Sequence, residues 1–152
     1  MSSNFDYHEF TEFNKKFGIM SKDLGGWLRK FLMEQAELVL KKARPLTPVD
    51  TGFMKSSWTT DEGQLKGGKS NPAKSSSSGV RQTVQLSDVK VVGKNLQVTV
   101  GNAAEYSSYI EYGAKGRAGL FILEISCDEI MYKMPARFRT QFEKFLKSKG
   151  VV

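Results

Sequence analysis

The sequence LTPVDTG at residues 46–52, followed by an aromatic residue at Trp58, separates two different patterns in this chain. Before it, apolar residues recur at helical spacing, and after it strand-like alternation appears at residues 83–92 and 95–100. Pro45 ends the helical pattern, because the residue before a proline is pushed out of the α region. The stretch therefore predicts a junction between a helical part and a β-rich part.

Local chemistry within the stretch supports a tight turn. Asp50 can cap a short turn through residues 53–57, and Gly52 can take a backbone angle that other residues resist. Trp58 then begins a strand.

Two helices are expected upstream of the junction. The first, over residues 6–17, is predicted by phenylalanines at i, i+3 and i+7, which are Phe10, Phe13 and Phe17. Gly18 is its expected stop. Ser21 can cap the second helix, which continues to Ala43.

Downstream, residues 61–82 lose periodicity and are rich in glycine, serine and lysine, which predicts a flexible arm. Residues 83–92 and 95–100 alternate apolar and polar side chains around a tight connection at Gly93. They predict an antiparallel hairpin with one buried face and one solvated face.

The last third of the chain contains a short aromatic segment, Tyr106–Tyr112, and a long helical pattern over residues 119–149. Pro135 allows either one kinked helix or two helices in tandem. Ser126 and Glu129 have the spacing of a capping box. The order helix, hairpin, helix predicts an α+β fold with N-terminal helices, an antiparallel sheet bearing the long arm, and a C-terminal helix packed on the sheet.

Length and composition predict one domain over residues 1–152, helical at 6–44, β-rich at 53–112 with the arm at 61–82, and helical again at 119–149. The net charge of +7 permits contact with nucleic acid or an acidic surface. No stretch is long and apolar enough for a membrane helix, and residues 1–6 lack the regions of a signal peptide, so we expect synthesis in a cytoplasm. With Cys127 as the only cysteine and His8 as the only histidine, we expect no zinc site, and no cofactor.

Two chemical alternatives arise from the residues. Asp50-Thr51-Gly52 is the catalytic tripeptide of aspartic proteases, but that chemistry needs a preceding apolar strand, and here a helix precedes it. We therefore expect no catalytic residues. The second alternative is a nucleic-acid-binding module that uses the basic 63–82 loop. Its possible phosphate contacts are Lys66, Lys69, Lys74 and Arg81.

The residues at the junction and in the aromatic segment resemble those of the head–tail joining, or tail-completion, proteins of tailed bacteriophages, a gp-ten-like neck family. The resemblance rests on Thr47–Gly52, Ser57-Trp58, Tyr106–Gly113 and Phe121–Leu146, in that order. It covers roughly residues 20–149. The chain departs from the family in a longer arm at 61–82 and in lacking a threonine after Tyr112-Gly113.

The resemblance implies a non-enzymatic virion protein that assembles as a ring, expected to be sixfold, at the neck between head and tail. Its partners would be further copies of itself, neck or connector proteins, tail-tube or tail-terminator proteins, and passing double-stranded DNA, with no membrane; assembly would occur in the host cytoplasm. The arm would order on a neighbour. The expected oligomer or partner contacts are Thr47, Pro48, Val49, Asp50, Thr51, Gly52, Trp58, Tyr106, Tyr109, Glu111 and Tyr112.

Overall fold

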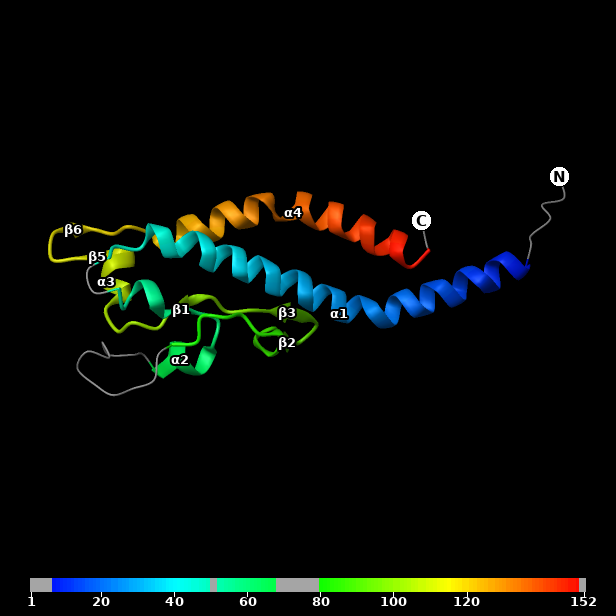
Figure 1. Cartoon of the computed structure of the whole chain (residues 1–152), viewed down its shortest axis with the longest axis horizontal. Coiled ribbons are helices and arrows are strands. Elements are labelled where there is room, and N and C mark those ends of the chain that lie inside the picture. The colour runs from blue at the N-terminus through cyan, green and yellow to red at the C-terminus, as the bar shows by residue number, and fades with distance from the viewer. Residues whose placement is uncertain (1–6, 50–51, 68–79, 151–152) are drawn as a thin grey trace.

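A computed structural model describes residues 7–49, 52–67 and 80–150 of the chain. Two long helices, α1 (Tyr7–Leu46) and α4 (Ile122–Ser148), lie side by side, and short strands and helices gather along one half of the pair (Figure 1). Helices at both ends of the chain with small antiparallel sheets between them confirm the α+β class.

Helix α1 runs without interruption from Tyr7 to Leu46, so the prediction of two helices was wrong. Gly18 does not stop the helix and Ser21 does not begin a new one. A glycine inside a helix costs only about 1 kcal/mol relative to alanine, which the strong helix formers on either side outweigh. Pro45 lies in the last turn, one residue before the helix ends.

Helix α4, Ile122–Ser148, is a single helix with Pro135 inside it. Of the two arrangements that the sequence allowed, the chain adopts one continuous helix. The predicted capping box was wrong, because the helix begins four residues before Ser126, whose side chain is fully buried within α4.

An aromatic seam joins α1 to α4. Trp27 of α1 has ring centroids 5.3–5.6 Å from those of four phenylalanines, which are Phe31, Phe138, Phe142 and Phe145. Ion pairs from Lys42 to Glu129 and from Lys149 to Asp23 lie along the same contact. The C-terminal helix therefore packs along α1, where the sequence predicted packing on a sheet.

The sheets are three separate two-stranded pairs within the described residues. They are β1 (Trp58–Thr59) with β4 (Gly101–Asn102), β2 (Lys90–Val92) with β3 (Asn95–Gln97), and β5 (Gly113–Ala114) with β6 (Arg117–Ala118), all antiparallel.

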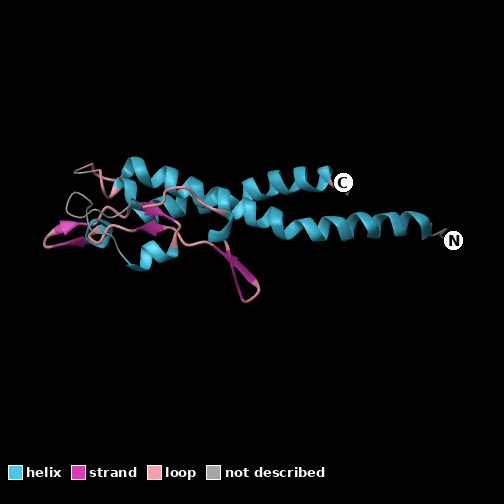
Figure 2. Ribbon diagram, turned by 60° about the horizontal axis from the view of Figure 1, so that its bottom comes forward, coloured by secondary structure: helices cyan, strands magenta, loops and turns pink. Residues whose placement is uncertain are grey.

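The predicted hairpin exists as β2–β3, but it is shorter than expected and has no buried face. Val91 and Val92 are both exposed, and Figure 2 shows the hairpin projecting away from the helix pair. Residues 83–89 do not extend the strand, since Leu86–Asp88 form a 3-10 helix, η3. The valines of β2 therefore mark strand propensity without burial, whereas Val89, just before the strand, is buried.

The first part of the predicted flexible arm is a helix, α2 (Glu62–Gly67), so the expectation of an unstructured segment was wrong there. The Asp61 carboxylate accepts hydrogen bonds from the backbone of Gly63 and Gln64 at 3.0 and 3.3 Å, which caps this helix. Residues 68–79 of the arm lie outside the described residues. A 3-10 helix at Lys55–Ser57, η1, occupies the turn predicted at 53–57.

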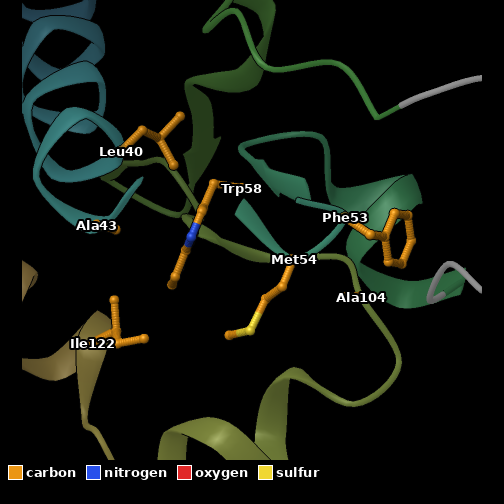
Figure 3. Close-up of a cluster of buried hydrophobic side chains, with 7 residues drawn as sticks. All are labelled: Leu40, Ala43, Phe53, Met54, Trp58, Ala104 and Ile122. Carbon is orange, nitrogen blue, oxygen red and sulfur yellow. The ribbon is translucent and has the colours of Figure 1, made fainter. Parts of the chain in front are cut away.

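The main core lies where the end of α1 meets β1 and the first turn of α4 (Figure 3). Its buried members are Leu40, Ala43, Phe53, Met54, Trp58, Ala104 and Ile122. Because the cluster draws on both long helices and on the segments between them, it fixes the residues of both sequence motifs relative to each other.

Candidate functional site

The first motif is anchored in the core by Thr47 and Trp58. Both are buried, and the Trp58 indole Nε1–H donates a 2.7 Å hydrogen bond to Thr47 Oγ1. Thr47 Oγ1 in turn donates to the carbonyl of Ala43 at 2.8 Å. This chain of bonds ties the end of α1 to β1, so these two residues position a surface and do not form it.

The second motif forms helix α3, Ser107–Tyr112, in a region where the sequence predicted β-structure. Glu111 is buried, and its carboxylate accepts hydrogen bonds from the backbone of Leu123 and Glu124 at 3.0 and 3.1 Å. Since a carboxylate at a helix N-terminus satisfies free N–H groups and opposes the helix dipole, Glu111 acts as a remote cap of α4.

The loop between α3 and α4 requires glycine at two points. A Cβ on Gly113, which has φ +86°, would lie 2.4 Å from the Arg117 carbonyl oxygen. A Cβ on Gly119 would lie 2.4 Å from the Glu111 carbonyl oxygen. Only glycine allows this approach of the backbone, which seats the β5–β6 loop against α3. Neither glycine was predicted from the sequence as a site residue, although both stand in the glycine-rich stretch after Tyr112.

Exposed apolar side chains gather on the outside of this framework. Val49 is 67% exposed, Tyr109 63% and Tyr112 71%. Leu120 and Phe121 are also exposed. Aromatic residues that keep a polar group are favoured at subunit interfaces, where they bury a large area and still form hydrogen bonds.

A cavity of about 530 Å³ lies between the two motifs, and we call it the motif groove. It is lined by Pro48, Val49, Gly52 and Met54 from the first motif and its turn, by Tyr106, Tyr109 and Ile110 from the second, and by Arg117, Ala118 and Leu120 from the loop. The two segments that the sequence singled out thus meet at one surface. Gly52 has φ +74°, a backbone angle that other residues resist, as the sequence predicted. Asp50 and Thr51 lie outside the described residues.

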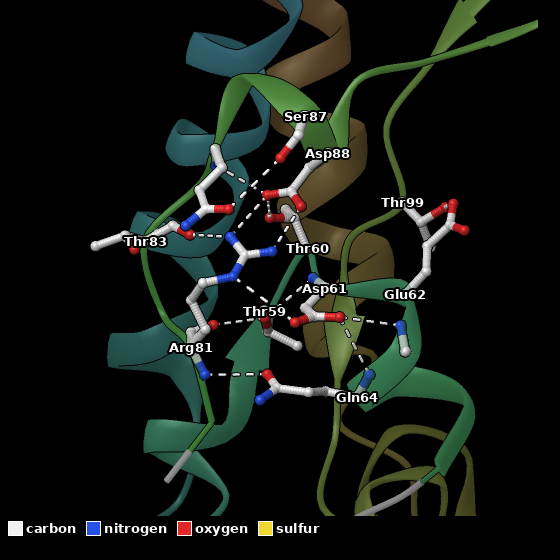
Figure 4. A network of polar contacts seen from close by, with 12 residues as sticks. Thr59, Thr60, Asp61, Glu62, Gln64, Arg81, Thr83, Ser87, Asp88 and Thr99 are labelled. Carbon is white, nitrogen blue, oxygen red and sulfur yellow. Dashed lines mark hydrogen bonds and ion pairs between the residues drawn. The ribbon is translucent and has the colours of Figure 1, made fainter.

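The four possible phosphate contacts do not form one described cluster. Lys66 is exposed at the end of α2, and Lys69 and Lys74 lie outside the described residues. Arg81 is held by Asp88 through two hydrogen bonds of 2.8 and 2.6 Å (Figure 4).

The Arg81–Asp88 pair is part of a polar network that fixes the end of the arm to the 3-10 helix η3. Burial on its own raises the pKa of Asp88, but hydrogen bonds from Arg81, from the backbone of Gln85 and from Thr60 outweigh it and lower that pKa below 3.8. The Thr60 hydroxyl donates to Asp88 at 2.7 Å. The guanidinium of Arg81 therefore has a structural partner inside the chain.

Among the residues that the structure describes, no group of three or more His, Cys, Asp or Glu side chains could hold a metal ion. None of the described helices has the length and apolar character to cross a membrane. Burial raises the pKa of the Cys127 thiol, which lies half-buried in α4.

Comparison with known proteins identifies one family. The model of the HK97-gp10-like family, described as "Bacteriophage HK97-gp10, putative tail-component", matches residues 11–113, which include both motifs. No curated protein and no solved structure matches the chain significantly. Since the family model spans more than half of the chain, the protein belongs to the HK97-gp10-like family of bacteriophage proteins.

Proposed function

We propose that this protein is a non-enzymatic structural component of a phage or phage-like particle that assembles as a ring at the junction of head and tail. The family's description as a tail component supports a structural role in the virion. Neck or connector proteins on one side and tail-tube or tail-terminator proteins on the other are its proposed partners. A sixfold ring would match the symmetry of a tail tube, and a head-to-tail interface between copies closes into such a ring.

The observation that carries the proposal is the exposed apolar surface at the motif groove. Val49 and Tyr109 are each more than half exposed, and they line a concave site of about 530 Å³. Contiguous apolar surface of this kind marks sites of protein association. The buried residues Thr47, Trp58 and Glu111 support it from beneath by fixing α1, β1 and α4.

The proposal is tested by negative-stain electron microscopy of the purified protein and of its mixture with neck and tail-tube proteins, together with the mass in solution. Rings that contain the protein are expected. Tyr109→Asp should abolish them, because it places a charge at the centre of the apolar contact. Tyr132→Asp is the matched control, since Tyr132 is an exposed tyrosine on α4 outside the motif groove. A protein that stays monomeric alone and in all the mixtures would overturn the proposal.

The same preparations separate this role from a nucleic-acid-binding module that uses the basic 63–82 loop. That module would bind DNA with an affinity that falls steeply with salt and that is lost when Lys66, Lys69 and Lys74 are neutralised. The pairing of Arg81 with Asp88 argues against Arg81 as a free phosphate contact. If DNA only passes through the ring, its binding should be weaker than that of such a module and should persist when the three lysines are neutralised.

A further inference from the structure

One face of α4 carries a stripe of largely exposed side chains. Its members follow one another at alternating spacings of three and four residues, which is the heptad spacing of helices that pack side by side. They are Ile125, Asp128, Tyr132, Pro135, Arg139 and Phe142, and we call them the α4 stripe. The first five are exposed and Phe142 is half-buried. In Figure 1 no described part of the chain lies on the side of α4 that is turned away from α1.

The α4 stripe is more apolar than an ordinary solvated helix face. Ile125 is 49% exposed and Tyr132 is 87% exposed. Pro135, three residues after Tyr132, adds a rigid apolar ring at the middle of the helix. The stripe extends about 26 Å along α4, at 1.5 Å per residue. Contiguous exposed apolar side chains of this kind mark a site of protein association.

Charge is unevenly distributed along α4. Residues 121–132 contain three carboxylates and no lysine or arginine, whereas residues 133–149 contain six lysines or arginines and one carboxylate. One charge of each sign lies on the stripe, Asp128 in the acidic half and Arg139 in the basic half. Neither forms an ion pair with another described residue. They lie eleven residues apart, about 16 Å along the helix, so they cannot pair with each other within one copy.

The stripe is complementary to itself when it is reversed. If a second α4 lies antiparallel to the first, with a twofold axis between residues 133 and 134, the six members meet in three kinds of contact, each formed twice. These contacts are Ile125 with Phe142, Asp128 with Arg139, and Tyr132 with Pro135. A parallel arrangement would instead place each charge beside the same charge of the other copy. Since charged residues on an apolar seam fix register and direction, the stripe selects an antiparallel second copy as its partner.

A groove beside the stripe fits the same arrangement. It has a volume of about 580 Å³ and lies between Phe31 of α1 and the second half of α4, where Phe138 and Phe142 line it. Met131, which is 60% exposed, precedes these two phenylalanines by seven and eleven residues and so lies on the same flank of α4. The twofold axis brings this flank of one copy beside the same flank of the other, with Met131 of the second copy level with residue 136. A methionine side chain is well suited to fill an irregular apolar groove.

We propose that two copies of this protein pair through an antiparallel contact of their α4 stripes, with Asp128 of each copy opposite Arg139 of the other and Met131 of each in the groove of the other. The contact is isologous, so it closes at two copies. No member of the stripe lines the motif groove. The pairing is therefore separate from the proposed ring contact and does not depend on it.

Exchanging the two charges tests the proposal. The measurement is sedimentation equilibrium in a Tyr109→Asp background, which removes the ring contact and leaves the pair to be measured alone. Asp128→Arg and Arg139→Asp should each raise the dissociation constant of the pair by roughly tenfold or more, because like charges then meet twice in each pair. The double variant Asp128→Arg/Arg139→Asp should pair as the parent does, since opposite charges meet again. The matched controls are Glu105→Arg and Lys94→Asp, which make the same changes of charge at exposed positions outside α4 and should have no effect.

Cross-linking gives an independent readout that does not depend on affinity. In a Cys127→Ser background, chains carrying Asp128→Cys and chains carrying Arg139→Cys should form a mixed disulfide when they are combined and oxidised. Either chain alone should not, because its two cysteines would lie about 16 Å apart along the pair.

The outcomes distinguish the pair from the ring. Tyr132→Asp in the otherwise unaltered chain should lose the pair and keep the rings. A parent that stays monomeric, a double variant that fails to recover, or a mixed disulfide no faster than that of either chain alone would overturn the α4 contact and leave the ring proposal standing. Pairs that form while no ring appears, alone or with neck and tail-tube proteins, would support the α4 contact and overturn the ring.

Discussion

Replacing Glu111 by glutamine is expected to destabilise the fold by about 2–3 kcal/mol. The carboxylate accepts two backbone hydrogen bonds, of 3.0 and 3.1 Å, at the start of α4, and it is buried. A hydrogen bond to a charged group contributes about 1.5–3 kcal/mol, and one between neutral groups about 1 kcal/mol. Glutamine keeps one acceptor, now neutral, and turns an amide NH₂ toward the second N–H, so one charged bond is lost and the other weakened.

Urea unfolding followed by circular dichroism measures this change, and for a chain of this size the midpoint of thermal unfolding should fall by about 4–12 °C. Glu105→Gln is the matched control, because Glu105 is an exposed carboxylate in the same segment and its loss should cost less than about 0.5 kcal/mol. Hydrogen exchange at the amides of Leu123 and Glu124 should accelerate only in the Glu111 variant. Equal stability of the two variants would refute the assignment of Glu111 as the cap of α4.

Thr47→Val should lower the free energy of unfolding by about 1–3 kcal/mol, because it leaves the buried Trp58 N–H without an acceptor. The double variant with Trp58→Phe should lose less stability than the two single variants added together, and a double-mutant cycle of unfolding measures the difference. Acidification should remove the stability that comes from the lowered pKa of Asp88. This contribution to the free energy of unfolding is complete well above pH 3.8 and is lost as the pH falls through the folded-state pKa. The slope of the free energy of unfolding against pH, below about pH 4, should therefore be smaller in Asp88→Asn. Gly113→Ala should cost at least about 1–3 kcal/mol through its positive φ and close backbone contact, whereas Gly25→Ala, in open space on α1, should stabilise the protein by about 0.5–1 kcal/mol in the same unfolding assay.

Helical periodicity was sufficient to predict both long helices but not their continuity. Gly18 looked like a stop because a single glycine is a local signal, while the helix is decided by the sum over all of its residues. The hairpin around Gly93 was predicted correctly as a pair of strands, since turn chemistry is local. Its exposure was not, because burial depends on what packs against a strand, and the valines of β2 have no helix over them.

The candidate site, like the fold, could be predicted from the sequence only in part. The sequence indicated that the two motifs belong together, and they do meet at the motif groove. The roles of individual residues depended on contacts between segments far apart in the chain, as when Trp58 binds Thr47, Glu111 caps α4, or Arg81 pairs with Asp88. The family resemblance suggested interface roles for Trp58 and Glu111, whose side chains are in fact buried.

The composition of the main core has a consequence for the timing of folding. Leu40 and Ile122 pack in one cluster although more than half of the chain separates them, so closing that loop carries an entropic cost that no local contact offsets in advance. A nascent chain still holding Ile122 within the ribosome lacks one wall of the core. The motif groove therefore rests on a core that is completed only after synthesis has passed the first turn of α4.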